Sequence, residues 1–293
     1  PQYTDSGQKI KLVKNEKGKH KPDVDIYSWY ESKDFWIDLE NEIPNIERLY
    51  IVGGEPLMID QHYEFLQKCI DADRSNKIVI EYNTNITNIP QRAWDIWKHF
   101  KQVNIGASID GVGDINYYMR YPSNFDKIYE NLVKLSKAEG NFKVWIAATI
   151  NVFNALHFPE YMEWIIKNKL PRVNDDNFKP IITPHPLHGP KFYNTRMFPK
   201  KVKDLIHQKY EDYKPVLMDL IDNQDWDSER KQASKKEVVR LLDQYSKYMY
   251  AKDFSDVIPQ FWKATRRLDE IRGHSIEDYI PELYSVLKEY EVS

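Results

Sequence analysis

Short apolar segments of strand length alternate with segments of helical periodicity through the first two thirds of this chain. Strands are predicted at residues 49–52, 77–82, 103–109 and 142–150, with a shorter fifth strand at 178–183. The segments between them repeat their apolar residues at the spacing of helices that cover one face of a sheet. This alternation, with short polar connections, is typical of βαβ units and predicts an α/β fold with a parallel sheet or barrel.

The two ends of the chain follow other patterns. Residues 1–44 are predicted to form a loop or weak hairpin and then a helix, which Pro44 interrupts before the first strand of the sheet. Residues 45–190 hold the alternating segments. Residues 191–293 contain only segments of helical period, so we predict a mainly helical C-terminal region.

Composition narrows the class of protein. The chain has 293 residues, 41% of them hydrophobic, which is enough to bury a core. A formal net charge of -3 gives no electrostatic reason to expect nucleic acid or a membrane surface as a partner. The sequence has no signal peptide and no apolar run of about 18 residues, so a cytoplasmic location is predicted. The single cysteine, Cys69, excludes an internal disulfide and is predicted to be a buried core thiol.

Polar residues follow the ends of the predicted strands. Gly53-Gly54-Glu55-Pro56 comes directly after the first strand, and its glycines permit a tight turn and a close approach of the backbone to a ligand. Any one strand end of this kind is also typical of an ordinary turn. Because the carboxyl ends of parallel strands meet at one edge, we expect the recurring residues to converge on one cavity. The residues at the later strand ends are Asn83 and Asn85, Ser108 and Asp110, and Asn151.

Three of these strand ends carry a resemblance to a known family. Gly53-Gly54-Glu55-Pro56, Tyr82-Asn83-Thr84-Asn85 and Ser108-Ile109-Asp110-Gly111, in this order, resemble motifs of the radical S-adenosylmethionine (SAM) enzymes. The chain is most similar to the subgroup in which a partial (β/α)6 TIM-like barrel of parallel strands precedes a twitch or SPASM-like C-terminal region. The resemblance covers residues 45–190 and extends more loosely into the C-terminal helices.

The resemblance implies how the two ends of the cofactor would bind. Gly53-Gly54-Glu55, with Pro56 behind them, would hold the methionyl amino group of SAM, and the Glu55 carboxylate would face the ammonium. The backbone at residues 181–182 would pass the adenine.

The resemblance also implies contacts along the middle of the cofactor. Asn83 and Asn85 would lie near it, and Ser108 and Asp110 would hydrogen-bond its ribose or carboxylate. Asn151 would approach the ribose. No catalytic residue and no metal ligand is assigned within this sequence.

The activity implied by the resemblance is reductive cleavage of SAM. The product, a 5′-deoxyadenosyl radical, would abstract hydrogen from a substrate, and the implied partners are an electron donor and a substrate such as a peptide or protein.

One required element of the family is missing from this sequence. Radical SAM enzymes hold a 4Fe-4S cluster on three cysteines in a CxxxCxxC pattern after their first strand. The sequence starts at Pro1 without that pattern, and we expect it to begin downstream of the cluster loop. The cluster is then expected only with the missing N-terminal segment, and the chain as given is expected to be inactive. The alternative is a cluster-less accessory module that binds SAM or a nucleotide without radical chemistry.

Other residues allow two further interpretations. His185 and His188 lie in a segment predicted to be a loop, and without a third ligand they are interpreted as loop residues, as is the isolated His157. A TIM-type hydrolase with a strand-end carboxylate is a further alternative, but no Ser-His-Asp set or paired-acid pattern accompanies Glu55.

Overall fold

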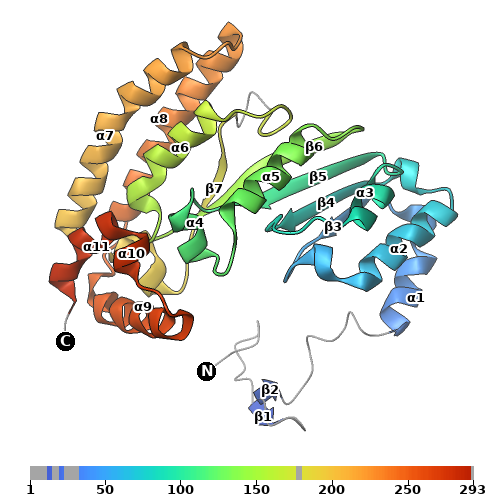
Figure 1. The fold of residues 1–293 in the computed structure, drawn as a ribbon, viewed down its shortest axis with the longest axis horizontal. Helices are drawn as coiled ribbons and strands as arrows, with labels where there is room; N and C mark the ends of the chain where they lie inside the picture. Colours follow the sequence, from blue (N-terminus) through green and yellow to red (C-terminus); the bar gives the residue numbers. More distant parts are fainter. Residues whose placement is uncertain (1–11, 15–19, 23–32, 176–179, 292–293) are drawn as a thin grey trace.

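A five-stranded parallel sheet forms the centre of the protein (Figure 1). The structure, a computed structural model, describes residues 12–14, 20–22, 33–175 and 180–291. The strands lie in the sheet in the same order as in the sequence. Consecutive βαβ units give this order when each new strand pairs with the one before it. The strands are β3 (Arg48–Ile51), β4 (Val79–Thr84), β5 (Gln102–Ser108), β6 (Phe142–Ile150) and β7 (Thr183–Pro186). A separate antiparallel pair consists of β1 (Leu12–Lys14) and β2 (His20–Pro22).

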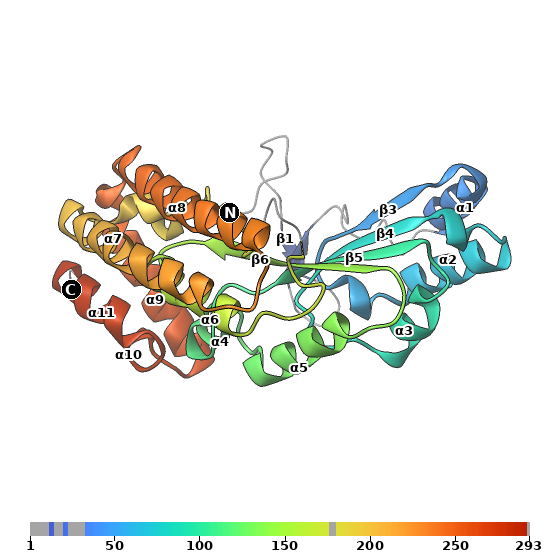
Figure 2. The same cartoon turned by 90° about the horizontal axis from the view of Figure 1, so that it is seen from above.

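Helices connect consecutive strands of the sheet. Figure 2 shows α2, α3 and α5 together on one face of it. The predicted parallel α/β architecture of alternating strands and helices is therefore confirmed. The helices up to β7 are α1 (Lys33–Asn41), α2 (Asp60–Asp71), α3 (Gln91–Trp97), α4 (Asp114–Met119), α5 (Phe125–Ser136) and α6 (Phe158–Lys167).

The two faces of the sheet differ in burial. Along β4, the buried Ile80 and Tyr82 alternate with the half-buried Glu81 and Asn83, as expected for a strand with one face against helices. Strand β6 alternates in the same way, from the buried Phe142 onward. Polar side chains thus gather on the more open face, whereas the apolar side chains form the core beneath the helices.

The described residues beyond β7 form helices. Figure 1 shows α7 (Lys200–Asp222) and α8 (Ser228–Tyr250) side by side as a long hairpin, which α9 (Ile258–Arg272) follows. Helix α9 ends at Gly273, whose left-handed φ of 70° makes it a helix-terminating residue. Two short helices, α10 (Ile276–Tyr279) and α11 (Pro281–Leu287), complete this region. None of the described helices combines the length and apolar character needed to cross a membrane.

The predicted position of the fifth strand is wrong. Phe178 and Lys179 lie outside the described residues, and β7 occupies Thr183–Pro186, so that Ile181 and Ile182 precede the strand. Its two prolines are tolerated because β7 is the last strand in the sheet order and pairs with β6 alone. His185 consequently lies in a strand and not in the predicted loop.

Candidate functional site

The turn after β3 presents its backbone to open space. Gly53 has φ of 100° and Gly54 has φ of 54°, a backbone conformation that residues with a side chain rarely adopt. A Cβ atom added at either position would meet no atom of the described residues within 4 Å. The glycines are therefore required by the shape of the turn, and the described part of the chain leaves space beside them that a ligand could enter.

Glu55 is held in place by the neighbouring strand. Its Oε1 accepts a hydrogen bond from Thr84 Oγ1 at 2.6 Å and a longer one from the Leu57 amide at 3.3 Å. Its Oε2 accepts the Asn85 amide at 2.9 Å. A carboxylate offers about four acceptor positions, so these three bonds orient Glu55 and leave one position for a further donor.

The side chains of Asn83 and Asn85 have different partners, because Asn83 lies in β4 and Asn85 follows its last residue. The Nδ2 group of Asn83 donates to the Tyr50 hydroxyl at 2.8 Å on the open face of the sheet. Asn85 meets Glu55 through its backbone, while its side-chain Oδ1 accepts the Thr87 amide at 2.9 Å and closes a local turn. The structure thus joins Asn85 to Glu55 and directs Asn83 toward β3.

Asp110 is a buried residue at the end of β5, with 5% of its surface exposed. Its Oδ1 accepts the Thr149 amide at 2.7 Å, and its Oδ2 lies 2.7 Å from Nε of Arg120. The Asp110 backbone is fixed as well, because its carbonyl accepts the Asn154 side chain at 2.7 Å. Asp110 therefore connects the end of β5 to β6 through a hydrogen bond. It connects the same end to Arg120, the residue after α4, through an ion pair.

Asn151 and Ser108 stand near this network. Asn151 Oδ1 accepts the Phe153 amide at 2.9 Å, and the Asn151 amide donates to Asn154 Oδ1 at 2.8 Å. Asn154 thus ties the loop after β6 to Asp110. Ser108 is half-buried at the end of β5.

A cavity of about 370 Å³ brings two of the predicted residues together. It lies beyond the ends of β5 and β6, against α9, and both Asp110 and Asn151 line it. Glu55, Asn83, Asn85 and Ser108 are not among its lining residues, so the strand ends do not all open into this one cavity.

The backbone predicted to pass the adenine has other partners. Ile181 and Ile182 are almost fully buried, and the Ile181 amide donates to Glu237 Oε2 of α8 at 2.9 Å. That amide is therefore engaged within the protein.

His157 is not isolated, contrary to the interpretation from the sequence. Its Nδ1 lies 3.3 Å from Glu282, and Glu160 completes a group whose ligand atoms fall within 4.8 Å of one another. The ammonium of Lys209 already contacts both carboxylates. Burial and the charge of Lys209 lower the pKa of His157. The two carboxylates of this group are thus already paired with a cation of the protein itself.

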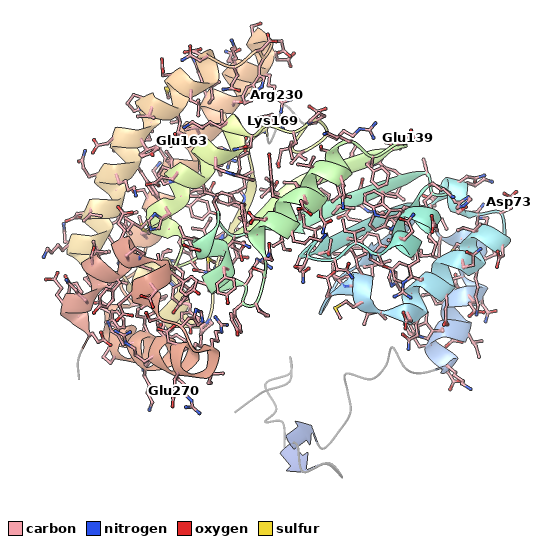
Figure 3. All side chains as sticks on the ribbon, viewed as in Figure 1. Asp73, Glu139, Glu163, Lys169, Arg230 and Glu270 are labelled. Atoms are coloured by element: carbon pink, nitrogen blue, oxygen red, sulfur yellow. The ribbon has the colours of Figure 1, made fainter. Side chains whose placement is uncertain are left out.

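Lys169 is another half-buried titratable group near the sheet. Burial, reinforced by the charge of Arg230, lowers its pKa to about 7. Lys169 Nζ and Arg230 Nη2 donate to the same carbonyl, that of Asn174, at 2.9 and 3.2 Å, and Figure 3 shows the two side chains close together. These contacts fasten the segment after α6 to α8, which is a structural task.

The only thiol of the chain does not fit an iron-sulfur site. Cys69 lies in α2 with no exposed surface, as predicted for a core thiol, and burial raises its pKa to about 11. A 4Fe-4S cluster is held by several cysteine thiolates, and this chain has one cysteine. The residues of this sequence therefore do not fit a 4Fe-4S cluster.

Several residues at this edge were not found from the sequence. Thr84 lay inside a recognised motif, between Asn83 and Asn85, but only the pairing of β3 with β4 shows that its hydroxyl reaches Glu55. Arg120 and Arg272 follow no spacing rule relative to Asp110 or Asn151.

Protein-family models and curated proteins are the two comparisons that bear on the family of this chain. No family model matches it, and no match was found among curated proteins. The site geometry is therefore the basis for the functional proposal.

Proposed function

We propose that the carboxyl edge of the sheet binds S-adenosylmethionine, and that the chain serves a radical SAM reaction. The observation that carries the proposal is the position of the Glu55 carboxylate, which Thr84 and Asn85 hold by hydrogen bonds. It follows two glycines with positive φ, beside which the described residues leave open space. In that reaction a 5′-deoxyadenosyl radical would abstract hydrogen from a substrate, with peptides as the first class to examine.

The chemistry of an amino group suits this turn. An ammonium carries three N–H donors and needs acceptors in a compact arrangement. The remaining acceptor position of Glu55 supplies the countercharge, and a charge-assisted hydrogen bond of this kind is stronger than a neutral one. Gly53 and Gly54 add backbone carbonyls that no side chain of their own shields.

We further propose that the five-stranded sheet is the main part of a partial (β/α)6 barrel. The sequential strand order and the helices on one face support this arrangement. The open face, with Tyr50, Glu81 and Asn104 in register, would form the polar lining of the barrel interior.

The cluster is not assigned to residues of this chain. Because Cys69 is the single cysteine and is buried, these 293 residues account for binding and orientation of SAM but not for its reduction. The reductive step requires cysteine ligands that this sequence does not contain. The same observation favours a second candidate, a module that binds SAM or a nucleotide without radical chemistry.

Calorimetric titration with SAM, and with an analogue that lacks the amino group, tests the binding proposal. We expect the analogue to bind at least about tenfold more weakly, because it lacks the partner of Glu55. Equal affinities would contradict the amino-group assignment. In the native protein, 5′-deoxyadenosine formed with a reductant would support the radical reaction, binding of SAM without cleavage would support the module, and no binding would exclude both.

A further inference from the structure

The cavity between the ends of β5 and β6 and helix α9 carries an excess of positive charge. Its charged lining residues are Asp110, Arg120 and Arg272. Arg120 is neutralised by Asp110 at 2.7 Å, and 26% of its side chain remains exposed. Arg272 is the remaining charge, and within residues 33–175 and 180–291 it lies within 4.0 Å of no carboxylate oxygen.

Arg272 uses little of its hydrogen-bonding capacity. Its Nη1 donates to the Tyr118 carbonyl at 2.9 Å, and its guanidinium lies over the Tyr121 ring at 5.4 Å. A guanidinium has five N–H donors in a fork that matches the oxygens of a carboxylate or phosphate. The stacking on Tyr121 holds this fork in place while most of its donors remain available.

Three residues that carry neutral donor groups line the same cavity. The groups are the Thr149 hydroxyl, the Asn151 side-chain NH₂ and the Tyr193 hydroxyl, and none of them donates to another described residue. Burial is the main cause that raises the pKa of Tyr193, which keeps its hydroxyl protonated as a donor. Because these three groups have no acceptor among the described residues, they are available to donate to a ligand in the cavity.

We propose that this cavity binds the anionic group, a carboxylate or a phosphate, of a ligand other than SAM. Arg272 supplies the charge, and Thr149, Asn151 and Tyr193 supply neutral donors. A volume of about 370 Å³ accommodates a small molecule or a single side chain. Asp110 and Asn151, which line this cavity, were also predicted to contact SAM, so SAM is included as a competitor in the test below. Glu55 itself follows β3, two strands away from β5 and so about 10 Å from it across the sheet.

Titration calorimetry with inorganic phosphate and with glutarate tests the inference. We expect at least one of the two probes to bind the wild-type chain, and the stronger of them names the ligand class. Arg272→Gln is expected to weaken that binding about tenfold or more, because a charged hydrogen-bonding partner is lost. Arg267→Gln is the matched control, since Arg267 lies on the same helix and pairs with Glu270. Binding of neither probe, or equal effects of the two substitutions, would overturn the inference.

A second variant covers the case in which Arg272→Gln disturbs the fold. Tyr193→Phe removes only the hydroxyl and should weaken binding several-fold, and unchanged binding would remove Tyr193 from the site. The titrations are then repeated with saturating SAM. Retained binding supports a separate ligand, whereas displacement by SAM would place the cavity inside the cofactor site and overturn the inference. If SAM itself does not bind, the titrations of phosphate and glutarate without SAM still test whether the cavity binds an anion.

Discussion

The hydroxyl of Thr84 donates to Oε1 of Glu55 at 2.6 Å, which joins the end of β4 to the turn after β3. Thr84 is 2% exposed, whereas Glu55 is only half-buried, so the bond connects the buried core to an accessible carboxylate. The orientation of Glu55 is therefore set by the end of the adjacent strand together with the Leu57 amide of its own turn. A ligand that meets Glu55 encounters an acceptor already fixed in position, which lowers the entropy lost on binding.

Replacing Thr84 by valine tests this positioning. Thr84→Val keeps the shape of the side chain but removes the donor to Glu55 and the acceptor of the Ile86 amide. We expect a loss of about 1–3 kcal/mol in the free energy of unfolding, because a buried amide loses its partner. Thermal and urea unfolding measure it, with Thr87→Val as the control for the same substitution nearby. A Thr84→Val protein as stable as the control would contradict the role given to this bond.

The ion pair between Asp110 and Arg120 should matter for stability. Asp110→Asn removes the charge that neutralises Arg120 and weakens the acceptor for the Thr149 amide. We expect the free energy of unfolding to fall by about 2–3 kcal/mol, somewhat less than for a fully buried pair because Arg120 keeps some contact with water. Urea denaturation measures the change, and Asp114→Asn, at an exposed position in α4, should have little effect. Similar values for the two variants would refute the assignment.

Gly106 is predicted to tolerate no larger side chain. A Cβ atom there would lie 2.5 Å from Asn83 Oδ1 and 2.8 Å from Cζ2 of Trp145 on the open face. Gly106→Ala should therefore displace both side chains, lower the free energy of unfolding by about 1–3 kcal/mol and shift the tryptophan fluorescence. Gly189→Ala, where a Cβ would meet no atom of the described segments within 4 Å, is the control. The packing account fails if both variants have the stability of the wild type.

Acid should destabilise the protein through His62. This residue is 4% exposed, and burial lowers its pKa from 6.5 to about 4, with the nearby Arg92 also lowering it. Its Nδ1 already contacts the Ile59 carbonyl at 2.6 Å, and its Nε2 has no partner among the described residues. Between pH 6.5 and about 4 the unfolded chain binds the proton and the folded chain does not, so stability falls as the pH is lowered through this window.

The expected loss from His62 is about 3 kcal/mol, since each unit of pKa difference corresponds to about 1.4 kcal/mol. Urea denaturation at pH 7, 5.5 and 4 measures it. His62→Gln should have a shallower decline than the wild type, whereas His99→Gln, at an exposed position, should decline as the wild type does. Parallel declines in all three proteins would exclude His62 as the cause.

The sequence predicts the positions of strands correctly where an alternating apolar pattern extends over the whole strand. Strand β6 was predicted at residues 142–150 and forms there, because its alternation of buried and less buried residues extends over the whole strand. Strand β7 was misplaced because the apolar pair Ile181-Ile182 lies before it, while the strand itself contains two prolines. Local rules disfavour proline in strands, and only the neighbouring β6 makes this edge position acceptable.

In the candidate site, too, features set by local sequence could be predicted, whereas contacts between distant segments could not. The glycines of the turn and the position of Glu55 after β3 follow from local sequence, since backbone freedom and strand ends are local properties. The bond from Thr84 to Glu55 and the approach of Arg272 to the ends of β5 and β6 depend on packing between distant segments. No local pattern encodes such contacts, which is why the sequence did not predict them.

Calorimetric titration of SAM into Glu55→Gln and Glu81→Gln tests the central claim most directly. Both substitutions remove one negative charge from the same sheet, but Glu81 pairs with Arg48 on the open face. We predict that Glu55→Gln weakens SAM binding about tenfold or more, because a neutral amide replaces the countercharge of the ammonium, and that Glu81→Gln retains the wild-type affinity. Unchanged affinity in Glu55→Gln, or equal losses in both variants, would contradict the assignment of Glu55 as the amino-group partner.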